Sequence, residues 1–191
     1  MKNYLPALAL LALVGCASVA KVETGERIIG NRLALTLTGS WNHVSAPGLG
    51  PAQTWTMEGL PVDQLLIYSG LKDGEAIHGT TAGQTDKKTF HFRSGMQPDE
   101  IAGLFEGMLT RDGSSYKLLK LEPSSFGGHK GFRFEYALIR KIDNVQLSGV
   151  GFGAVSKGEL FALVYMAPRL AFFTRHSPAV EQIAQSAQVK Q

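Results

Sequence analysis

Apolar and polar residues alternate along several short segments of the chain, a period of two that is typical of half-buried β-strands. The alternation is strict over residues 32–38, and it returns at residues 89–93, where Phe90 and Phe92 would face inward. Further strand candidates lie at residues 53–57, 64–68, 116–121, 132–140, 145–155 and 160–166. Because only short turns separate the later candidates, we expect them to pair in antiparallel fashion.

Two segments repeat apolar residues every three or four positions instead, as amphipathic helices do. The first begins at Pro98, a residue suited to the first helical position, and it ends before Asp112-Gly113. The second runs from about Pro178 to Gln188, with Ser177 as its N-cap, and we expect a shorter helical turn from Pro168.

Strands followed by a helix, twice over, predict an α+β fold, in which an antiparallel β-sheet of six to eight strands is flanked by helices. The chain has 191 residues, of which 44% are hydrophobic, and this length accommodates one ordinary domain with a core of its own. We place this single domain at residues 32–191.

The N-terminus has the pattern of a secretory signal, with Lys2 followed by an uncharged apolar stretch. Residues 13–16 (LVGC) resemble the bacterial lipobox, in which a peptidase cleaves before an acylated cysteine. The resemblance implies a signal peptide over residues 1–15, cleavage between Gly15 and Cys16, and lipidation of Cys16. Cleavage elsewhere, for example after Ala20, and an uncleaved N-terminal anchor are the alternatives.

Residues 16–31 mix small, charged and turn-forming residues without a period, so we expect a mobile, lipidated tether there. No Asp follows Cys16, which in lipoproteins of bacteria with two membranes resembles sorting to the outer membrane, facing the periplasm. The outer leaflet of the inner membrane is the alternative. Cys16 is the one cysteine of the chain, so the domain itself offers neither a disulfide nor a thiolate.

Charge argues against nucleic acid as a partner. The net charge is only +3, from 19 basic and 16 acidic residues, and no run of Lys or Arg exceeds two residues. A surface that follows a phosphate backbone needs a denser cluster of cations.

No motif in the sequence indicates catalysis. Gly149, Gly151 and Gly153 alternate inside a strand candidate, which differs from a dinucleotide-binding loop between a strand and a helix. We expect these glycines to let a helix or an aromatic side chain lie close to the sheet. The five histidines show no metal-ligand spacing, and no GxSxG elbow occurs. We therefore predict no catalytic residue, metal ligand or cofactor.

The second half of the chain resembles PsbP-like domains. The resemblance rests on residues 131–136 (GFRFEY), on the apolar strand at 160–165 after Lys157-Gly158, and on the stripe that follows to Ser186. It covers roughly residues 90–188. It implies an α/β/α sandwich, a fold also used by a yeast nuclear-import factor, and a class of small, often non-enzymatic accessory proteins.

These observations predict a bacterial envelope lipoprotein that acts as a non-catalytic accessory or binding subunit, with the membrane and an envelope protein as partners. We expect Trp41 in the core and Trp55 as a possible partner surface. Two alternatives stay open. One is a carrier of a small apolar ligand, held between the helix at 98–109 and the strands of Phe90, Phe92, Phe132 and Phe134. The other is a hydrolase, which requires a histidine beside both a serine and a carboxylate.

Overall fold

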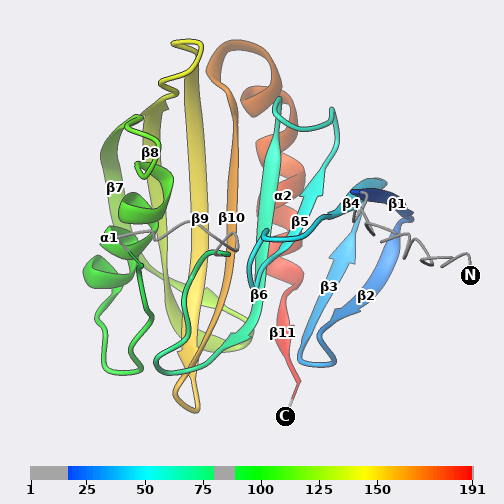
Figure 1. Cartoon of the computed structure of the whole chain (residues 1–191). Coiled ribbons are helices and arrows are strands. Elements are labelled where there is room, and N and C mark those ends of the chain that lie inside the picture. The colour runs from blue at the N-terminus through cyan, green and yellow to red at the C-terminus, as the bar shows by residue number, and fades with distance from the viewer. Residues whose placement is uncertain (1–16, 80–88, 191) are drawn as a thin grey trace, which may run out of the picture.

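The structure is a computed structural model, and it describes residues 17–79 and 89–190. Gly15, Cys16 and the predicted signal peptide lie outside the described residues. The centre of the fold is an antiparallel sheet of eight strands in the order β1-β4-β5-β6-β10-β9-β8-β7 (Figure 1). Its strands are β1 (Ser18–Val22), β4 (Trp41–Ser45), β5 (Gln53–Thr56), β6 (Gln64–Leu71), β7 (Ser115–Phe126), β8 (His129–Ile139), β9 (Gln146–Ser156) and β10 (Glu159–Pro168).

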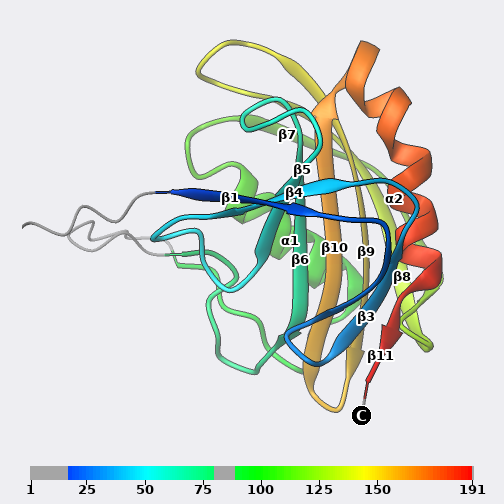
Figure 2. The same ribbon diagram turned by 90° about the vertical axis from the view of Figure 1, so that its right-hand side faces the viewer.

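Helices cover both faces of this sheet. Helix α1 (Pro98–Leu109) lies on one face, and α2 (Thr174–Ser186) lies on the other after a π-helical segment, Arg169–Phe173 (Figure 2). A small sheet in the order β11-β3-β2 lies beside α2. It consists of β2 (Gly25–Ile29), β3 (Leu33–Leu37) and β11 (Gln188–Val189). The layers are therefore helix, sheet and helix.

The period of two along the strands divides the interior into two cores. On β6, Leu65 and Ile67 face α2, whereas Leu66 and Tyr68 face α1. All four side chains are buried, which is expected for a strand near the centre of a sheet with helices on both faces. The predicted α+β sheet of six to eight antiparallel strands is confirmed, with eight.

Helix α1 begins at Pro98, as predicted. The backbone N–H of Gln97 donates to Glu100 Oε2 over 2.7 Å, which closes the first turn. Trp41 is buried, also as predicted, and its ring meets that of Tyr165 edge to face at 6.2 Å.

The predicted tether over residues 16–31 is wrong for most of its length. Residues 18–22 form β1, which pairs with β4, and residues 25–29 form β2, which pairs with β3. Ile29 is buried in the core on the α2 side. These strands are short and mostly exposed, so their residues lack the apolar alternation by which the sequence analysis recognised strands. The folded domain begins near residue 18 instead of residue 32.

Two other boundaries differ from the prediction. Residues 89–93 form a single bridge, Ala76 to His91, because their backbone pairs with the loop at residues 74–77 instead of the sheet. Helix α2 begins at Thr174, so Ser177 is not its N-cap and Pro178 lies in its first turns. As the fifth residue of α2, Pro178 forgoes one backbone hydrogen bond, the one that an N–H there would donate to the carbonyl of Thr174.

Gly149, Gly151 and Gly153 make room for aromatic rings, but not for rings from a helix. The rings belong to Tyr136, Phe134 and Phe132 of the neighbouring strand β8, which pair with the three glycines in register. The predicted packing role is confirmed, and the partner is a strand of the same sheet.

Candidate functional site

Three connections meet at one end of the central sheet, which we call the apical end. In register, Gln64 at the start of β6 lies opposite Met166, and Leu147 near the start of β9 lies opposite Pro168. The β5–β6 connection (57–63), the β8–β9 turn (140–145) and the π-helical segment therefore lie together. At the opposite end, β9 turns into β10 at Lys157-Gly158.

Arg140 holds two of these connections together. Its Nη1 donates to the carbonyl oxygen of Pro61 over 2.6 Å, while Nε and Nη2 donate to both oxygens of Asp143, at 3.0 and 2.6 Å. These bonds from Arg140 lower the pKa of Asp143, and the same contacts raise the pKa of Arg140. Within the described residues, the hydrogen bonds of this guanidinium group therefore go to Asp143 and Pro61, both at the apical end.

Asp63 shapes the β5–β6 connection from inside. Its carboxylate is buried, and it accepts hydrogen bonds from the Thr56 hydroxyl and from the backbone N–H groups of Met57 and Glu58, the latter two at 2.9 and 2.8 Å. A buried carboxylate with three donors is a fixed anchor of the loop. This role explains the buried charge without any catalysis.

The third connection is tied to the first by Glu58. Its Oε1 lies 2.7 Å from His176 Nε2 and 3.6 Å from Arg175 Nη1, both at the start of α2. The three connections therefore form one cross-linked unit.

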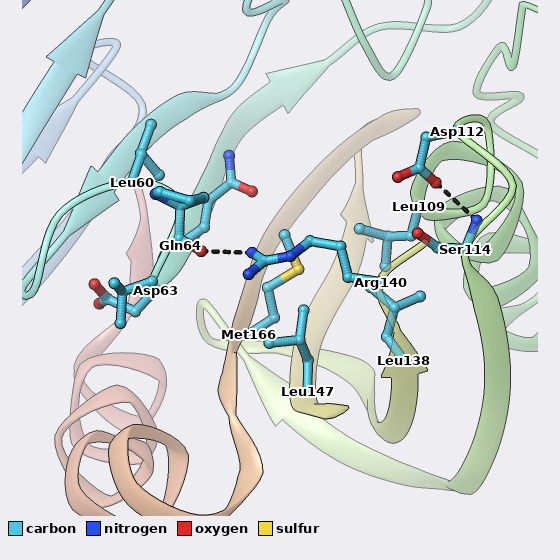
Figure 3. A pocket seen from close by; sticks show the side chains of 12 residues that line it. Leu60, Asp63, Gln64, Leu109, Asp112, Ser114, Leu138, Arg140, Leu147 and Met166 are labelled. Atoms are coloured by element: carbon cyan, nitrogen blue, oxygen red, sulfur yellow. Dashed lines mark hydrogen bonds between the residues drawn. The ribbon is translucent and has the colours of Figure 1, made fainter. Parts of the chain in front are cut away.

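A pocket of about 300 Å³ opens between these connections and the C-terminal end of α1 (Figure 3). Its floor is apolar, and the Arg140 guanidinium points across it toward the β5–β6 connection. We call it the apical pocket. It is lined by Leu60, Pro61, Val62, Asp63, Gln64, Leu109, Asp112, Ser114, Leu138, Arg140, Leu147 and Met166. Such a mixed lining, mostly apolar with a few polar groups, is typical of binding pockets.

Large aliphatic side chains are exposed around the apical end. Ile142 in the β8–β9 turn is 87% exposed, and Leu170 in the π-helical segment is 88% exposed. Leu60 and Ile139 are also exposed, at 41% and 45%. Together with the exposed cations Lys141 and Arg169, these residues form what we call the apical surface. The apolar atoms here cover no core, so this surface is available for contact.

A second cavity, of about 280 Å³, adjoins the apical pocket and shares Gln64, Leu109 and Asp112 with it. We call it the His78 cavity, after the histidine in its wall. It is lined by Leu49, Gln64, Leu66, Tyr68, Ile77, His78, Met108, Leu109, Arg111 and Asp112.

His78 is only 7% exposed, and its Nδ1 lies 2.9 Å from both Arg111 Nη1 and the carbonyl oxygen of Gly79. A guanidinium group only donates hydrogen bonds, so we assign Nδ1 as the acceptor from Arg111 and place the ring proton on Nε2. Nδ1 then has no proton for the Gly79 carbonyl. Within the described residues, the buried Nε2 has no partner. An unmatched buried donor costs about 1–3 kcal/mol.

The aromatic region proposed for an apolar ligand is filled at its centre. Phe105 of α1 stacks on Phe134 of β8 with ring centroids 5.7 Å apart, and both are fully buried. A cavity of about 260 Å³ lies toward the start of α1, beside Pro98, Ile101 and Phe132.

Trp55, the predicted partner surface, is 1% exposed. That prediction is wrong, because β5 lies inside the sheet and turns Trp55 into the core on the α2 side. Its indole N–H donates to Gln53 Oε1 over 3.1 Å.

Groups that could perform catalysis are dispersed. His129 Nε2 lies 3.2 Å from Ser156 Oγ, and no carboxylate bonds to this histidine within the described part of the chain. In residues 17–79 and 89–190, no group of three His, Cys, Asp or Glu side chains could hold a metal ion. The two described helices are also too short to cross a bilayer.

Comparison with solved structures identifies the type of fold. The solution structure of cyanobacterial PsbP (CyanoP) from Synechocystis matches with a TM-score of 0.56 and 14% identity, and the match covers 96% of this chain and 99% of that one. The fold is PsbP-like. The predicted resemblance and its sandwich are thereby confirmed.

Two crystal structures match less closely, each with a TM-score of 0.41. One is a putative regulator of unknown function from Pseudomonas aeruginosa, at 13% identity over 94% of this chain and 86% of that one. The other is LpqN, which is involved in cell envelope biogenesis of Mycobacterium tuberculosis, at 10% identity over 95% and 88%. No protein-family model and no curated protein sequence matches the chain.

The sequence analysis missed the apical residues. Ile142 did carry a signal, since it is a large aliphatic residue among charged and turn-forming neighbours, whereas Leu170 is followed by the apolar residues 171–173. Arg140 carried none, because its contact with Pro61 joins residues 79 positions apart.

Proposed function

We propose that the protein is a lipid-anchored, non-catalytic accessory protein of the bacterial envelope, and that it binds an envelope protein through the apical surface. The observation that carries the proposal is the apical pocket with aliphatic side chains exposed around it. Interfaces of this kind derive most of their affinity from one or two anchor side chains that enter a pocket.

The rigidity of the apical end supports this role. Arg140 and Glu58 cross-link the three connections, and Asp63 fixes the β5–β6 connection from inside, so little loop entropy is lost when a partner binds. The charges on the apical surface indicate the chemistry of that partner. Lys141 and Arg169 are exposed, so we expect an apolar anchor side chain flanked by acidic residues.

The test is crosslinking and affinity capture of the lipidated protein from intact envelopes, followed by mass spectrometry. The variant Ile142→Ser/Leu170→Ser removes the two most exposed apical side chains. The control is Ile28→Ser, which removes a 55% exposed isoleucine from the small sheet. We expect the apical variant to lose a stoichiometric partner that the control retains. Equal recovery of that partner by both variants would contradict the proposal.

The anchor has a separate test. The substitution Cys16→Ser, followed by cell fractionation, should leave the protein unprocessed and change its membrane association. If Cys16→Ser protein is processed and fractionates like the wild type, Cys16 is not the lipidation site.

A further inference from the structure

Strand β7 ends the central sheet, and its outer edge is open. It pairs with β8 on one side, and within the described residues no strand pairs with its other side. The strand has 12 residues, about twice the usual length of a strand. Two consecutive leucines on it, Leu118 and Leu119, are 40% and 54% exposed. A long edge with exposed apolar side chains is a template for a further strand.

A bulge in β7 changes which of its side chains share a face. Leu118 lies opposite Tyr136 and Lys120 lies opposite Glu135, so Leu119 is an extra residue between them. Side chains alternate between the two faces of a regular strand. The extra residue breaks this alternation, so the parts of β7 before and after Leu119 are out of phase by one position.

The change of phase places two leucines on the face that carries α1. Leu118 and Leu121 lie opposite Tyr136 and Phe134, whose rings belong to the core on the α1 side. Residues that lie opposite each other in an antiparallel pair have their side chains on the same face. Leu118 and Leu121 therefore share this face, although they are three positions apart.

The other face of β7 carries two opposite charges. Lys117 and Glu122 lie opposite Ala137 and Arg133. Arg133 donates from Nη2 to Glu181 of α2 over 2.6 Å, which identifies this as the α2 side. Lys117 and Glu122 therefore share the α2 side, although they are five positions apart.

These faces match when two copies of β7 lie edge to edge. A twofold axis perpendicular to the sheet joins identical edges into one antiparallel sheet, and each side chain then lies opposite one on the same face. In one such register, Leu118 lies opposite Leu121 of the second copy and Lys117 lies opposite Glu122 of the second copy. Apolar residues thus meet on the α1 side and opposite charges meet on the α2 side.

Neighbouring registers do not match. A shift of one position places Leu118 opposite Glu122 or Lys120, which lie on the other face. A shift of two positions places Lys117 opposite Lys120, a like-charge pair, or Lys120 opposite Leu121, which lie on different faces. The edge is therefore complementary to itself in one register across the bulge.

The two charges are available for this contact. Lys117 is exposed, and within the described part of the chain it has no ion-pair partner. The Glu122 carboxylate already lies 2.8 Å from Lys120 and 3.3 Å from Arg133, but it has about four acceptor positions and is partly exposed. Pro123 follows directly, and because it lacks an N–H group it ends the stretch that can pair.

We propose that the protein forms a homodimer in which the β7 edges of two copies pair in antiparallel fashion over residues 117–122. The twofold axis passes between Leu119 and Lys120, and the two central sheets become one continuous sheet. The interface uses residues outside the apical surface, so the inference is independent of the partner proposed there.

A membrane-anchored chain can adopt this arrangement. The perpendicular twofold axis keeps the α1 faces of both copies on the same side of the joined sheet. In Figure 2, β1 begins on the side of the sheet where α1 lies. Both lipid anchors then emerge on one side and can enter the same bilayer. This point alone rests on the proposed lipidation of Cys16, whereas the pairing of β7 does not.

Charge reversal tests the ion pairs. The full chain in dodecylmaltoside micelles should sediment as a dimer at about 0.1 mM. We expect Lys117→Glu to weaken the dimer by about tenfold, because two attractive pairs become repulsive. Lys117→Glu/Glu122→Lys restores opposite charges and should dimerise as the wild type does. The matched control is Lys130→Glu, which makes the same change of charge at an exposed lysine of β8. Unchanged near-UV circular dichroism shows that each variant is folded.

Cysteine crosslinking tests the register. Opposed Cα atoms of an antiparallel pair lie about 4.5–5.5 Å apart, within the range of a disulfide. Leu118→Cys/Leu121→Cys should therefore oxidise to a covalent dimer. Neither single variant should do so, because residue 118 of one copy lies about 10 Å from residue 118 of the other, and the same holds for residue 121. The wild type carries Cys16 and is the background for disulfides through that residue.

The proposal is supported if the wild type dimerises, Lys117→Glu loses the dimer and the double charge variant regains it. It is overturned if the wild-type chain sediments as a monomer at about 0.1 mM, or if Lys117→Glu dimerises as the wild type does. It is also overturned if the double cysteine variant stays monomeric under oxidation, or if the single cysteine variants crosslink as fully as the double one.

Discussion

The ring of Phe134 on β8 lies against the backbone of Gly151 on β9, where a Cβ atom would collide with it. Tyr136 and Phe132 lie in the same way against Gly149 and Gly153. The three rings form a continuous row, with centroid distances of 5.9 Å from Phe134 to Tyr136 and 6.2 Å from Phe134 to Phe132. The glycines thus allow an aromatic row to lie flat on the sheet beneath α1.

Gly151→Ala should therefore destabilise the fold, by about 1–3 kcal/mol, because Phe134 is buried and cannot move aside without strain. Urea unfolding measures the change. The control is Gly103→Ala on an exposed position of α1, where a Cβ meets nothing within 4 Å. That substitution should stabilise the protein by about 0.5–1 kcal/mol. If Gly151→Ala and Gly103→Ala change the free energy of unfolding equally, the contact between Phe134 and residue 151 is not tight.

Alkaline pH should unfold the protein through its buried tyrosines. Burial raises the pKa of Tyr68, Tyr116, Tyr136 and Tyr165 above the ordinary value of about 10. The unfolded chain loses these protons first, so their contribution to stability is complete below about pH 10 and is lost as the pH rises toward the folded pKa values. Phenolate absorbance from these residues should appear together with loss of near-UV circular dichroism. Ionisation of more than one tyrosine near pH 10 with the dichroism intact would contradict this assignment, since Tyr4 is the one tyrosine outside this set.

Acid should release the β8–β9 turn. Hydrogen bonds from Arg140 lower the pKa of Asp143, so the pair stabilises the fold above the ordinary aspartate pKa of about 3.9. This contribution is lost as the pH falls through the lower pKa of the folded state. The stability difference between wild type and Asp143→Asn should be present at about pH 6 and small at about pH 2. Asp99→Asn, on the exposed start of α1, is the control. A difference that does not depend on pH would rule out the ion pair as its source.

Asp63→Ala should destabilise the protein by about 3 kcal/mol, because it leaves the backbone N–H groups of Met57 and Glu58 without their acceptor. Thermal unfolding measures this effect. Asp63→Asn keeps one acceptor oxygen and should cost less. Should Asp63→Ala unfold like the wild type, water would have to replace the carboxylate, and the β5–β6 connection would not depend on it.

The period of apolar residues predicted the long strands and α1, because there the local pattern and the burial agree. It failed at β1 and β2, whose residues are mostly exposed and are held by backbone pairing with β4 and β3. Backbone pairing leaves little trace in side-chain identity, so a single sequence offers few signs of such strands.

The candidate sites were harder to predict than the fold. Trp55 was a candidate surface residue because aromatic residues near glycine- and proline-rich loops either anchor a core or line a binding surface, and it lies inward on β5. The pairing of Arg140 with Pro61, and of His78 with Arg111, joins distant residues, and neither pair has a spacing that a sequence reveals. Such contacts arise only when the order of strands in the sheet is known.

Strand β1 begins at Ser18, and this position limits the reach of the molecule. With the proposed acyl group on Cys16, only Ala17 separates the lipid from a hydrogen-bonded strand. Two residues span at most about 7 Å, so the domain stays close to the bilayer, unlike a lipoprotein whose domain follows a long flexible linker. The height of the apical surface above the membrane is then determined by the fold itself, and a partner must present its binding site at that height.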